Sequence, residues 1–262
     1  IEKGLRGGMS VITHRKAVSN NKYMSSYDPD KPSKYITYLD ANSLYSWSMN
    51  QYLPYGGFKW IDPEGFSFDD VRADSETGHI LEVDLNYPKE LHDFHNEYPY
   101  CCEHTLVEND MLSPYAAYIA EKHGLVGGKN SKLISSLTDK KRYVIHEMNL
   151  KQAVDAGLVL TKIHRVIEFK QKPWMKDFID FNIDKRKESK NEFEKGFFKI
   201  MCNATYGRTL MNLRKRQNIS LITDATKLND RVKKPDFISS KIFNENLVAV
   251  HNIKQKLYMN QP

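Results

Sequence analysis

The sequence has little cysteine and no long hydrophobic run. Three cysteines in 262 residues are too few for a disulfide scaffold, and such low usage is typical of a reducing compartment, the nucleus or the cytoplasm. No apolar stretch approaches the ~20 residues that a membrane span requires, and no signal peptide is visible. We therefore expect an intracellular protein without a membrane partner.

The composition, with 40% hydrophobic and 27% charged residues, is that of a globular protein with a real core. The formal net charge of +6 permits a polyanionic partner without establishing one. The chain opens at Ile1 and stops at Pro262 without a recognisable closing element. We expect a fragment of a longer protein.

A helix is predicted over Phe193–Gly207, which has no acidic residue from Lys195 to Gly207. At ~100° per residue its side chains divide between two faces. The apolar face, expected to pack on a core, holds Phe193, Phe197, Ile200, Met201 and Ala204. The opposite face, which suits a negatively charged planar partner such as a nucleotide, holds Lys195, Lys199, Asn203 and Tyr206.

The ends of this helix are also predicted by local patterns. Ser189 followed by Glu192 reads as a capping box at its start, and Gly207 is placed to end it. A second helical stretch, Trp174–Lys187, precedes it and ends in three basic residues. Because the link between them is short, the two helices should pack antiparallel.

A carboxylate follows a predicted strand near the N-terminus. The β-branched and aromatic residues of Lys34–Leu39 predict a strand that runs into Asp40, followed by a turn, a short helix and a closing Pro54–Gly57 turn. A carboxylate held rigidly at a strand end can bind Mg²⁺ together with a phosphate oxygen. A strand-end aspartate is more often a turn or cap residue, so the local pattern alone favours the structural role.

The middle and the end of the chain alternate short strands with loops. Strands are predicted at His79–Leu85, Lys132–Leu137 and Arg142–Ile145, a helix at Asn149–Ala156 ended by Gly157, and an extended segment at Leu158–Phe169. These elements indicate an α+β insertion. Beyond Gly207 we expect strands in 214–222 and Asp236–His251, separated by a helix near Ala225–Asp230.

Several groups of residues allow two interpretations. The basic residues Lys187, Lys195 and Lys199 suit phosphate, but by charge alone a solvated surface is favoured. The run 214–216 suits either a DNA backbone or a charged strand edge. Trp47, Trp60 and Trp174 are expected to pack in cores or within the insertion rather than to stack on bases. Zinc-type ligands at spacings of no known finger occur at His92, His95, Cys101, Cys102 and His104.

Two motifs in this order resemble motifs A and B of family B DNA polymerases. Motif A, D-x-x-S-L-Y, is matched by Asp40, Ser43, Leu44 and Tyr45, and motif B, K-x-x-x-N-S-x-Y-G, by Lys199, Asn203, Tyr206 and Gly207, with Ala204 in place of serine. The spacing is similar to that of the protein-primed branch, found in certain bacteriophages, adenoviruses and Polinton/Maverick mobile elements. Leu5–Gly8 is similar to the Y-x-G-G element of the family, with Leu5 where tyrosine is usual.

The resemblance implies a role for each matched residue. Asp40 and the backbone carbonyl of Ala41 would hold catalytic Mg²⁺, one of two ions in the intact enzyme. The incoming dNTP would contact Ser43, Leu44, Tyr45, Lys187, Lys195, Lys199 and Asn203, with Tyr45 excluding a 2′-hydroxyl. The template and the nascent base pair would contact Tyr206, Gly207, Arg6, Gly7 and Gly8. The implied partners are a DNA template-primer, dNTPs and a terminal, priming protein.

The resemblance also implies an architecture, an incomplete α+β domain with a partly formed antiparallel palm sheet and helical-hairpin fingers. The palm with motif A would span 1–57, a terminal-protein-region-like insertion 58–172, the fingers 173–207, and the segment after motif B 208–262. The second metal-binding carboxylate of the family, in a D-T-D motif, is absent. We therefore expect the intact parent to polymerise and these 262 residues alone not to. The alternatives are a catalytically dead nucleic-acid-binding remnant of a mobile element and an unrelated α+β binding protein.

Overall fold

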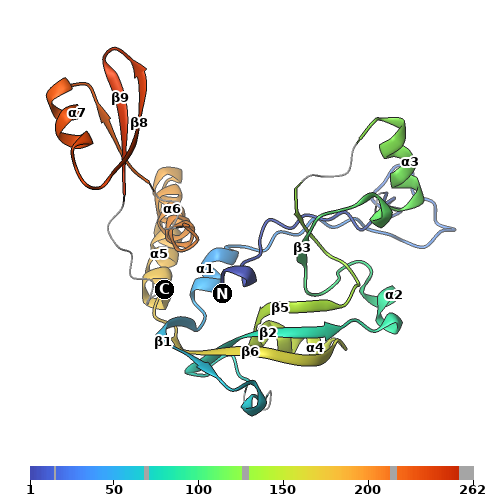
Figure 1. Cartoon of the computed structure of the whole chain (residues 1–262). Helices are drawn as coiled ribbons and strands as arrows, with labels where there is room; N and C mark the ends of the chain where they lie inside the picture. The colour runs from blue at the N-terminus through green and yellow to red at the C-terminus, as the bar shows by residue number, and fades with distance from the viewer. Residues whose placement is uncertain (15, 68–70, 126–129, 213–216, 254–262) are drawn as a thin grey trace. The chain divides into compact units, whose positions relative to one another are not determined.

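The computed structural model describes residues 1–14, 16–67, 71–125, 130–212 and 217–253, and the chain divides into two compact units. Unit 1 comprises Ile1–Asn42 and Gly57–Lys172, and unit 2 comprises Ser43–Gly56 and Pro173–Pro262. Helices and antiparallel sheets occur in both units (Figure 1). The predicted α+β class is therefore confirmed.

Unit 1 is organised around a four-stranded sheet of order β1-β6-β2-β5. Its strands are β1 (Leu53–Ile61), β6 (Val159–Lys172), β2 (Thr77–Asn86) and β5 (Lys140–His146), and β2 pairs antiparallel with both β5 and β6. One face of the sheet packs on α4 (Glu147–Asp155), where Leu81, Val83 and Leu150 belong to one buried cluster. This core buries the α4 face of the sheet.

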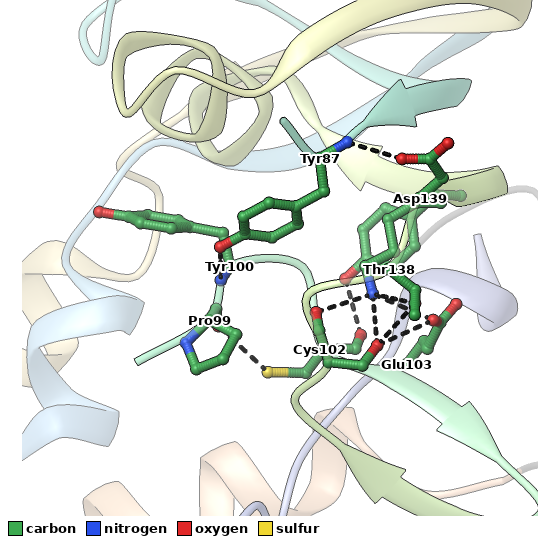
Figure 2. Close-up of polar contacts among 10 residues, drawn as sticks. Tyr87, Pro99, Tyr100, Cys102, Glu103, Thr138 and Asp139 are labelled. Carbon is green, nitrogen blue, oxygen red and sulfur yellow. Dashed lines mark hydrogen bonds and ion pairs between the residues drawn. The ribbon is translucent and has the colours of Figure 1, made fainter. Parts of the chain in front are cut away.

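Smaller elements of unit 1 attach to this sheet. They are η1 (Glu2–Gly4), η2 (Pro63–Gly65), η3 (Lys89–Leu91), α2 (His92–His95), β3 (Glu103–Thr105), η4 (Asn109–Met111), α3 (Pro114–Lys122) and β4 (Lys132–Ile134). The fully buried Lys140 donates from Nζ to Glu103 Oε1 at 3.0 Å and to Ser136 Oγ at 2.8 Å. Asp139 accepts the backbone N–H of Tyr87 beside it (Figure 2). A buried ammonium is tolerated because its donors are satisfied.

Unit 2 contains a helical part and a small sheet. The helices are α1 (Leu44–Met49), α5 (Lys176–Glu188) and α6 (Glu192–Thr209). Their shared core consists of Met49, Met175, Ile179 and Cys202. The sheet has the order β7-β9-β8, with strands β7 (Asn218–Ile222), β9 (Leu247–Asn252) and β8 (Phe237–Asn244), and α7 (Ala225–Val232) contacts it.

Most of the predicted elements are found with their ends shifted by a few residues. The strand predicted at His79–Leu85 is β2, the extended segment Leu158–Phe169 is β6, and the helix Asn149–Ala156 is α4. Gly157 follows α4 with φ of 102°, as expected of a glycine after a helix end. The predicted strand Lys132–Leu137 is shorter, and 214–216 lie outside the described residues.

The strand predicted at Lys34–Leu39 is wrong. Apart from one bridge between Asn20 and Lys34, this segment is irregular and its aromatic side chains are exposed. A strand needs a neighbour to satisfy its backbone groups, and no described residue pairs with 35–39. Asp40 therefore does not lie at a strand end, and the predicted Pro54–Gly57 turn lies inside β1 instead.

The predicted ends of α6 are also wrong. Ser189 ends α5, whereas Asn191 caps α6 and accepts the Glu194 N–H at 2.9 Å. Glu194 in turn accepts the backbone N–H of Lys190, so the capping signal lies two residues further on than predicted. The helix continues through Gly207 to Thr209.

The predicted packing of α6 is wrong. The apolar face that should have packed on a core is exposed, with Phe193 at 84% and Ile200 at 64%. The helix contacts α1 and α5 through Cys202 and Tyr206 instead. A helix buries the face that its neighbours complement, and the side chain of Tyr206 finds an aromatic partner on α1.

Candidate functional site

The two motif segments meet in unit 2 through their tyrosines. The rings of Tyr45 on α1 and Tyr206 on α6 stack, with centroids 4.1 Å apart and planes inclined by 9°. Tyr45 keeps 49% of its surface exposed, and Tyr206 is half-buried against the helical core. The stack places an aromatic wall with one accessible side between α1 and α6.

The position of Tyr45 is fixed by the packing of the short helix α1. Ser43 precedes α1 in the left-handed region, with φ of 52°, a conformation that costs free energy for a residue other than glycine. At the other end Met49 is buried among Met175, Ile179 and Cys202. Both ends of α1 are therefore constrained, and the ring of Tyr45 is held against α6.

A polar contact ties α1 to α5 as well. Asn50 Nδ2 donates to Asp180 Oδ1 at 2.7 Å, and Lys176 Nζ donates to Asp180 Oδ2 at 2.6 Å. The hydrogen bond from Lys176 lowers the pKa of Asp180 most, and the hydrogen bond from Asn50 lowers it further. The ionised carboxylate is thus the form that accepts both donors, and it orients the end of α1.

The predicted ligand residues of α6 differ in their availability. Lys195 is half-buried and pairs with Glu192 at 2.8 Å, which lowers the pKa of Glu192. Lys199 and Asn203 are exposed and make no ion pair or side-chain hydrogen bond with any residue in the described part of the chain. One helical turn separates them, so an ammonium and an amide lie side by side on α6.

The remaining predicted site residues of unit 2 lie on α5, at the start of α1 and in the last turn of α6. Lys187 is near the end of α5 and pairs with Asp184 at 2.9 Å, both side chains being mostly exposed. Ser43 and Leu44 begin α1 beside Tyr45, and Gly207 lies in the exposed last turn of α6. Exposed ion pairs are weak, so Lys187 and Lys195 can exchange their carboxylate partners for phosphate at little cost.

The predicted site residues of unit 1 differ in their exposure and in their contacts. Asp40 and Ala41 are exposed in an irregular segment, and Asp40 makes no hydrogen bond or ion pair with a described residue. Arg6 is bound within unit 1, because its Nη1 donates to Val144 O at 2.7 Å and its guanidinium lies 3.8 Å from the centre of the Tyr143 ring.

The glycines predicted to contact the template follow Arg6. Gly7 and Gly8 are exposed, and a Cβ at either would meet nothing within 4 Å. Gly8 has φ of 77°, which favours glycine at this position.

Two of the side chains considered for zinc have surroundings that disfavour metal binding. His95 is buried with its Nδ1 2.8 Å from the hydroxyl of Tyr87. Burial raises the pKa of the Cys101 thiol to about 11, which disfavours the thiolate that binds metal. Among the described residues no group of three or more His, Cys, Asp and Glu side chains could hold an ion.

Three features of the site were not predicted from the sequence. These are the stacking of Tyr45 on Tyr206, the burial of Cys202, and the bond between Asn50 and Asp180. A usable signal existed for one of them, since Cys202 and Tyr206 are four residues apart and share a helix face. Asn50 and Asp180 are 130 positions apart in the sequence, and no local sequence pattern predicts their hydrogen bond.

The fold is that of an α+β protein, and within unit 2 a tyrosine of the first motif stacks on a tyrosine of the second, on a helix that also carries exposed basic residues. The family model of DNA polymerase type B, organellar and viral, matches residues 25–260. That match covers most of the chain, which therefore belongs to this family, as the motifs indicated. The comparisons with curated proteins and with solved structures found no significant match. Within the described residues no helix is long and apolar enough to span a bilayer.

Proposed function

We propose that the chain carries the deoxynucleotide-binding part of a DNA-directed DNA polymerase of the protein-primed branch. The reaction in the intact parent is nucleotidyl transfer from a dNTP to a primer 3′-hydroxyl or to a priming protein. The observation that carries the proposal is the stack of Tyr45 on Tyr206. It brings Tyr45 of motif A against Tyr206 of motif B within unit 2, a contact that two unrelated motifs would have no reason to make.

Tyr45 is suited to select the sugar. Its ring is held from behind by Tyr206 at 4.1 Å, so it cannot retreat when a nucleotide packs on its exposed side. A deoxyribose fits against such a wall, whereas the 2′-hydroxyl of a ribonucleotide, the group that distinguishes RNA from DNA precursors, would be forced against the ring. Selection then follows from the rigidity of the stack.

The lysines and Asn203 are suited to the triphosphate. Lys199 has no competing carboxylate among the described residues, and Asn203 offers an amide one turn away. Lys195 and Lys187 add positive charge from exposed, exchangeable ion pairs. Positioning and charge neutralisation supply most of the catalysis of phosphoryl transfer, and these residues would supply part of both.

The family as a whole uses divalent metal ions. The residues present supply some of the ligands that one Mg²⁺ requires. Asp40 is an exposed carboxylate without a partner in the described part of the chain, and Mg²⁺ is usually held by one or two carboxylates together with substrate phosphates. Asp40 and the carbonyl of Ala41 would therefore hold one ion jointly with a triphosphate. Bound there, the ion would neutralise phosphate charge. The described residues contain no group of three or more His, Cys, Asp and Glu side chains that could hold an ion without such a phosphate.

Sugar discrimination tests the role of Tyr45. We expect the chain to bind dATP more tightly than ATP in the presence of Mg²⁺. The Tyr45→Val variant should have a smaller ratio of dATP affinity to ATP affinity, because the smaller side chain admits the 2′-hydroxyl. Tyr45→Phe keeps the ring and should keep the ratio. Trp47→Ala, an exposed change on the same helix, is the control. Equal affinity of the unmodified chain for both nucleotides would remove the basis of the proposal.

Incorporation of a labelled dNTP on a primed template tests the metal requirement. With one metal-binding carboxylate identified in the sequence, we expect no incorporation by these 262 residues, whereas nucleotide binding should persist. A catalytically dead nucleic-acid-binding remnant would lack both incorporation and dNTP binding. Clear incorporation would mean that Asp40 has a partner carboxylate that the motifs did not identify.

A further inference from the structure

The four-stranded sheet of unit 1 has a second face with a distinct chemistry. Side chains alternate across a strand, and Leu81 and Val83 of β2 face the core with α4. Glu82, between them, therefore lies on the opposite face. It stands directly across from Arg165 of β6 in the register of the two strands. This face carries charged and aromatic side chains beside the buried Val144, the partner of Glu82 on β5.

Glu82 organises two arginines on this face. Its side chain is only 5% exposed, and its Oε2 lies 2.6 Å from Arg165 Nε and 3.7 Å from Arg142 Nη1. The hydrogen bond from Arg165 lowers the pKa of Glu82 more than any other influence. The arginine side chains themselves are 57% and 66% exposed, so the carboxylate is buried beneath guanidinium groups that face solvent.

Asp84 repeats this arrangement two residues further along β2. Its Oδ1 accepts the backbone N–H of Arg142 at 2.8 Å, and its Oδ2 lies 3.9 Å from Lys141 Nζ. The Asp84 side chain is mostly buried whereas that of Lys141 is exposed. At both Glu82 and Asp84 the carboxylate is mostly buried and the cation that pairs with it is exposed to solvent. A partner approaching this face therefore meets three positive groups.

An exposed indole completes the surface. Trp60 of β1, the strand next to β6 in the sheet, is 65% exposed. The expectation that it packs in a core or within the insertion is therefore wrong, as it is for Trp47, which is 64% exposed. The guanidinium of Arg165 lies 5.4 Å from the centre of its ring, within reach of a cation–π interaction. This contact holds the indole beside the cations with much of its surface free.

From this arrangement we infer that unit 1 binds single-stranded nucleic acid on the sheet surface formed by Trp60, Arg165, Arg142 and Lys141. Unpaired bases stack on exposed aromatic rings, and the phosphates follow neighbouring cations. Arginines with fixed planes suit phosphate oxygens, because a guanidinium presents several donors in one geometry. A duplex hides the faces of its bases, so the exposed indole favours the single strand. This surface lies wholly in unit 1 and goes beyond the proposed dNTP site of unit 2.

The test is binding of a fluorescently labelled oligo(dT) to the full chain, followed by anisotropy at several salt concentrations. Base stacking on an aromatic ring contributes ~1–3 kcal/mol, so Trp60→Ala should weaken binding about fivefold or more. Arg142→Gln removes one phosphate contact and should make the salt dependence shallower by about 0.7 in log–log slope. Because Glu82 still pairs with Arg165 in the Arg142→Gln variant, we expect this variant to fold.

Matched controls separate the surface from general effects. Phe94→Ala removes an exposed ring of unit 1 away from these residues, and Arg72→Gln removes an exposed arginine that pairs with Asp74; neither should change the affinity. Lys199→Gln should leave oligo(dT) binding intact, and Trp60→Ala should leave dNTP binding intact, so failure here is distinguishable from failure of the dNTP site. The inference is overturned if Trp60→Ala and Phe94→Ala bind oligo(dT) alike, or if duplex DNA binds as tightly as oligo(dT).

Discussion

At the scale of single residues, His79 of β2 lies between two carboxylates. Its Nδ1 is 2.6 Å from Glu147 Oε2 and its Nε2 is 3.6 Å from Glu168 Oε2. The hydrogen bond with the buried Glu147 is the main reason why the pKa of His79 is raised. Glu168 also binds Lys59 at 2.7 Å. The imidazolium therefore links β2, α4 and β6 while it keeps its proton.

This geometry predicts a pH-dependent contribution to stability. A raised folded-state pKa stabilises the fold fully below the unfolded value of ~6.5, and the gain disappears as the pH rises through the folded value. Relative to His79→Gln, the unmodified chain should have a free energy of unfolding larger by on the order of 1 kcal/mol at pH 5.5, and the difference should shrink by pH 9.

Urea unfolding of both proteins at several pH values measures that difference. His146 titrates with the opposite sign, because burial lowers its pKa and the charge of His79 lowers it further; the comparison therefore measures His79 together with its smaller effect on His146. A difference that stays constant with pH would mean that the proton on His79 does not stabilise the fold.

At the scale of elements, the N-terminal cap of α6 distinguishes two signals in the sequence. We expect Asn191→Ala to destabilise unit 2 by about 1 kcal/mol, because the Glu194 N–H loses its acceptor. Ser189→Ala should cost less, since the hydroxyl of Ser189 only donates to Lys185 O at the end of α5. Thermal unfolding followed by circular dichroism compares the two variants. A larger effect at Ser189 would restore the capping box first predicted there.

Local patterns predicted the elements whose conformation depends on neighbours in sequence. The strand β2, the helix α4 with Gly157 after it, and the hairpin of α5 and α6 follow from periodicity and from cap residues. The segment Lys34–Leu39 and the orientation of α6 depend on distant partners instead. A strand-like sequence stays irregular where no strand pairs with it, and α6 buries Cys202 and packs Tyr206 because these side chains fit Tyr45 and the shared core.

At the scale of the whole molecule, each unit has its own hydrophobic core. Leu81 is fully buried in the core of unit 1, and Ile179 is fully buried in that of unit 2. Truncating a buried aliphatic side chain to alanine costs about 2–5 kcal/mol. We expect Leu81→Ala to accelerate amide hydrogen exchange in β2 and β6, and Ile179→Ala to accelerate it in α5 and α6. Equal acceleration throughout the chain by either variant would mean that the two cores unfold as one.

Family membership was accessible from the sequence because it rests on short motifs with fixed residues, such as Asp40 to Tyr45 and Lys199 to Gly207. The residues that complete the surfaces were less accessible. Trp60 becomes informative only when β1 is placed beside β6 and Arg165 is seen against its ring. The same holds for Asn50 and Asp180, which meet only after α1 packs on α5.

The central claim is that α6 binds the triphosphate of a dNTP, and one comparison tests it most directly. Equilibrium binding of dATP with Mg²⁺ and of oligo(dT) is measured for the unmodified chain, for Lys199→Gln, and for Lys227→Gln as an exposed control on α7. Loss of one charge-assisted contact of ~1.5–3 kcal/mol should weaken dATP binding about tenfold or more, with oligo(dT) binding nearly unchanged. Equal losses for dATP and oligo(dT), or a dATP affinity unaffected by Lys199→Gln, would contradict the account.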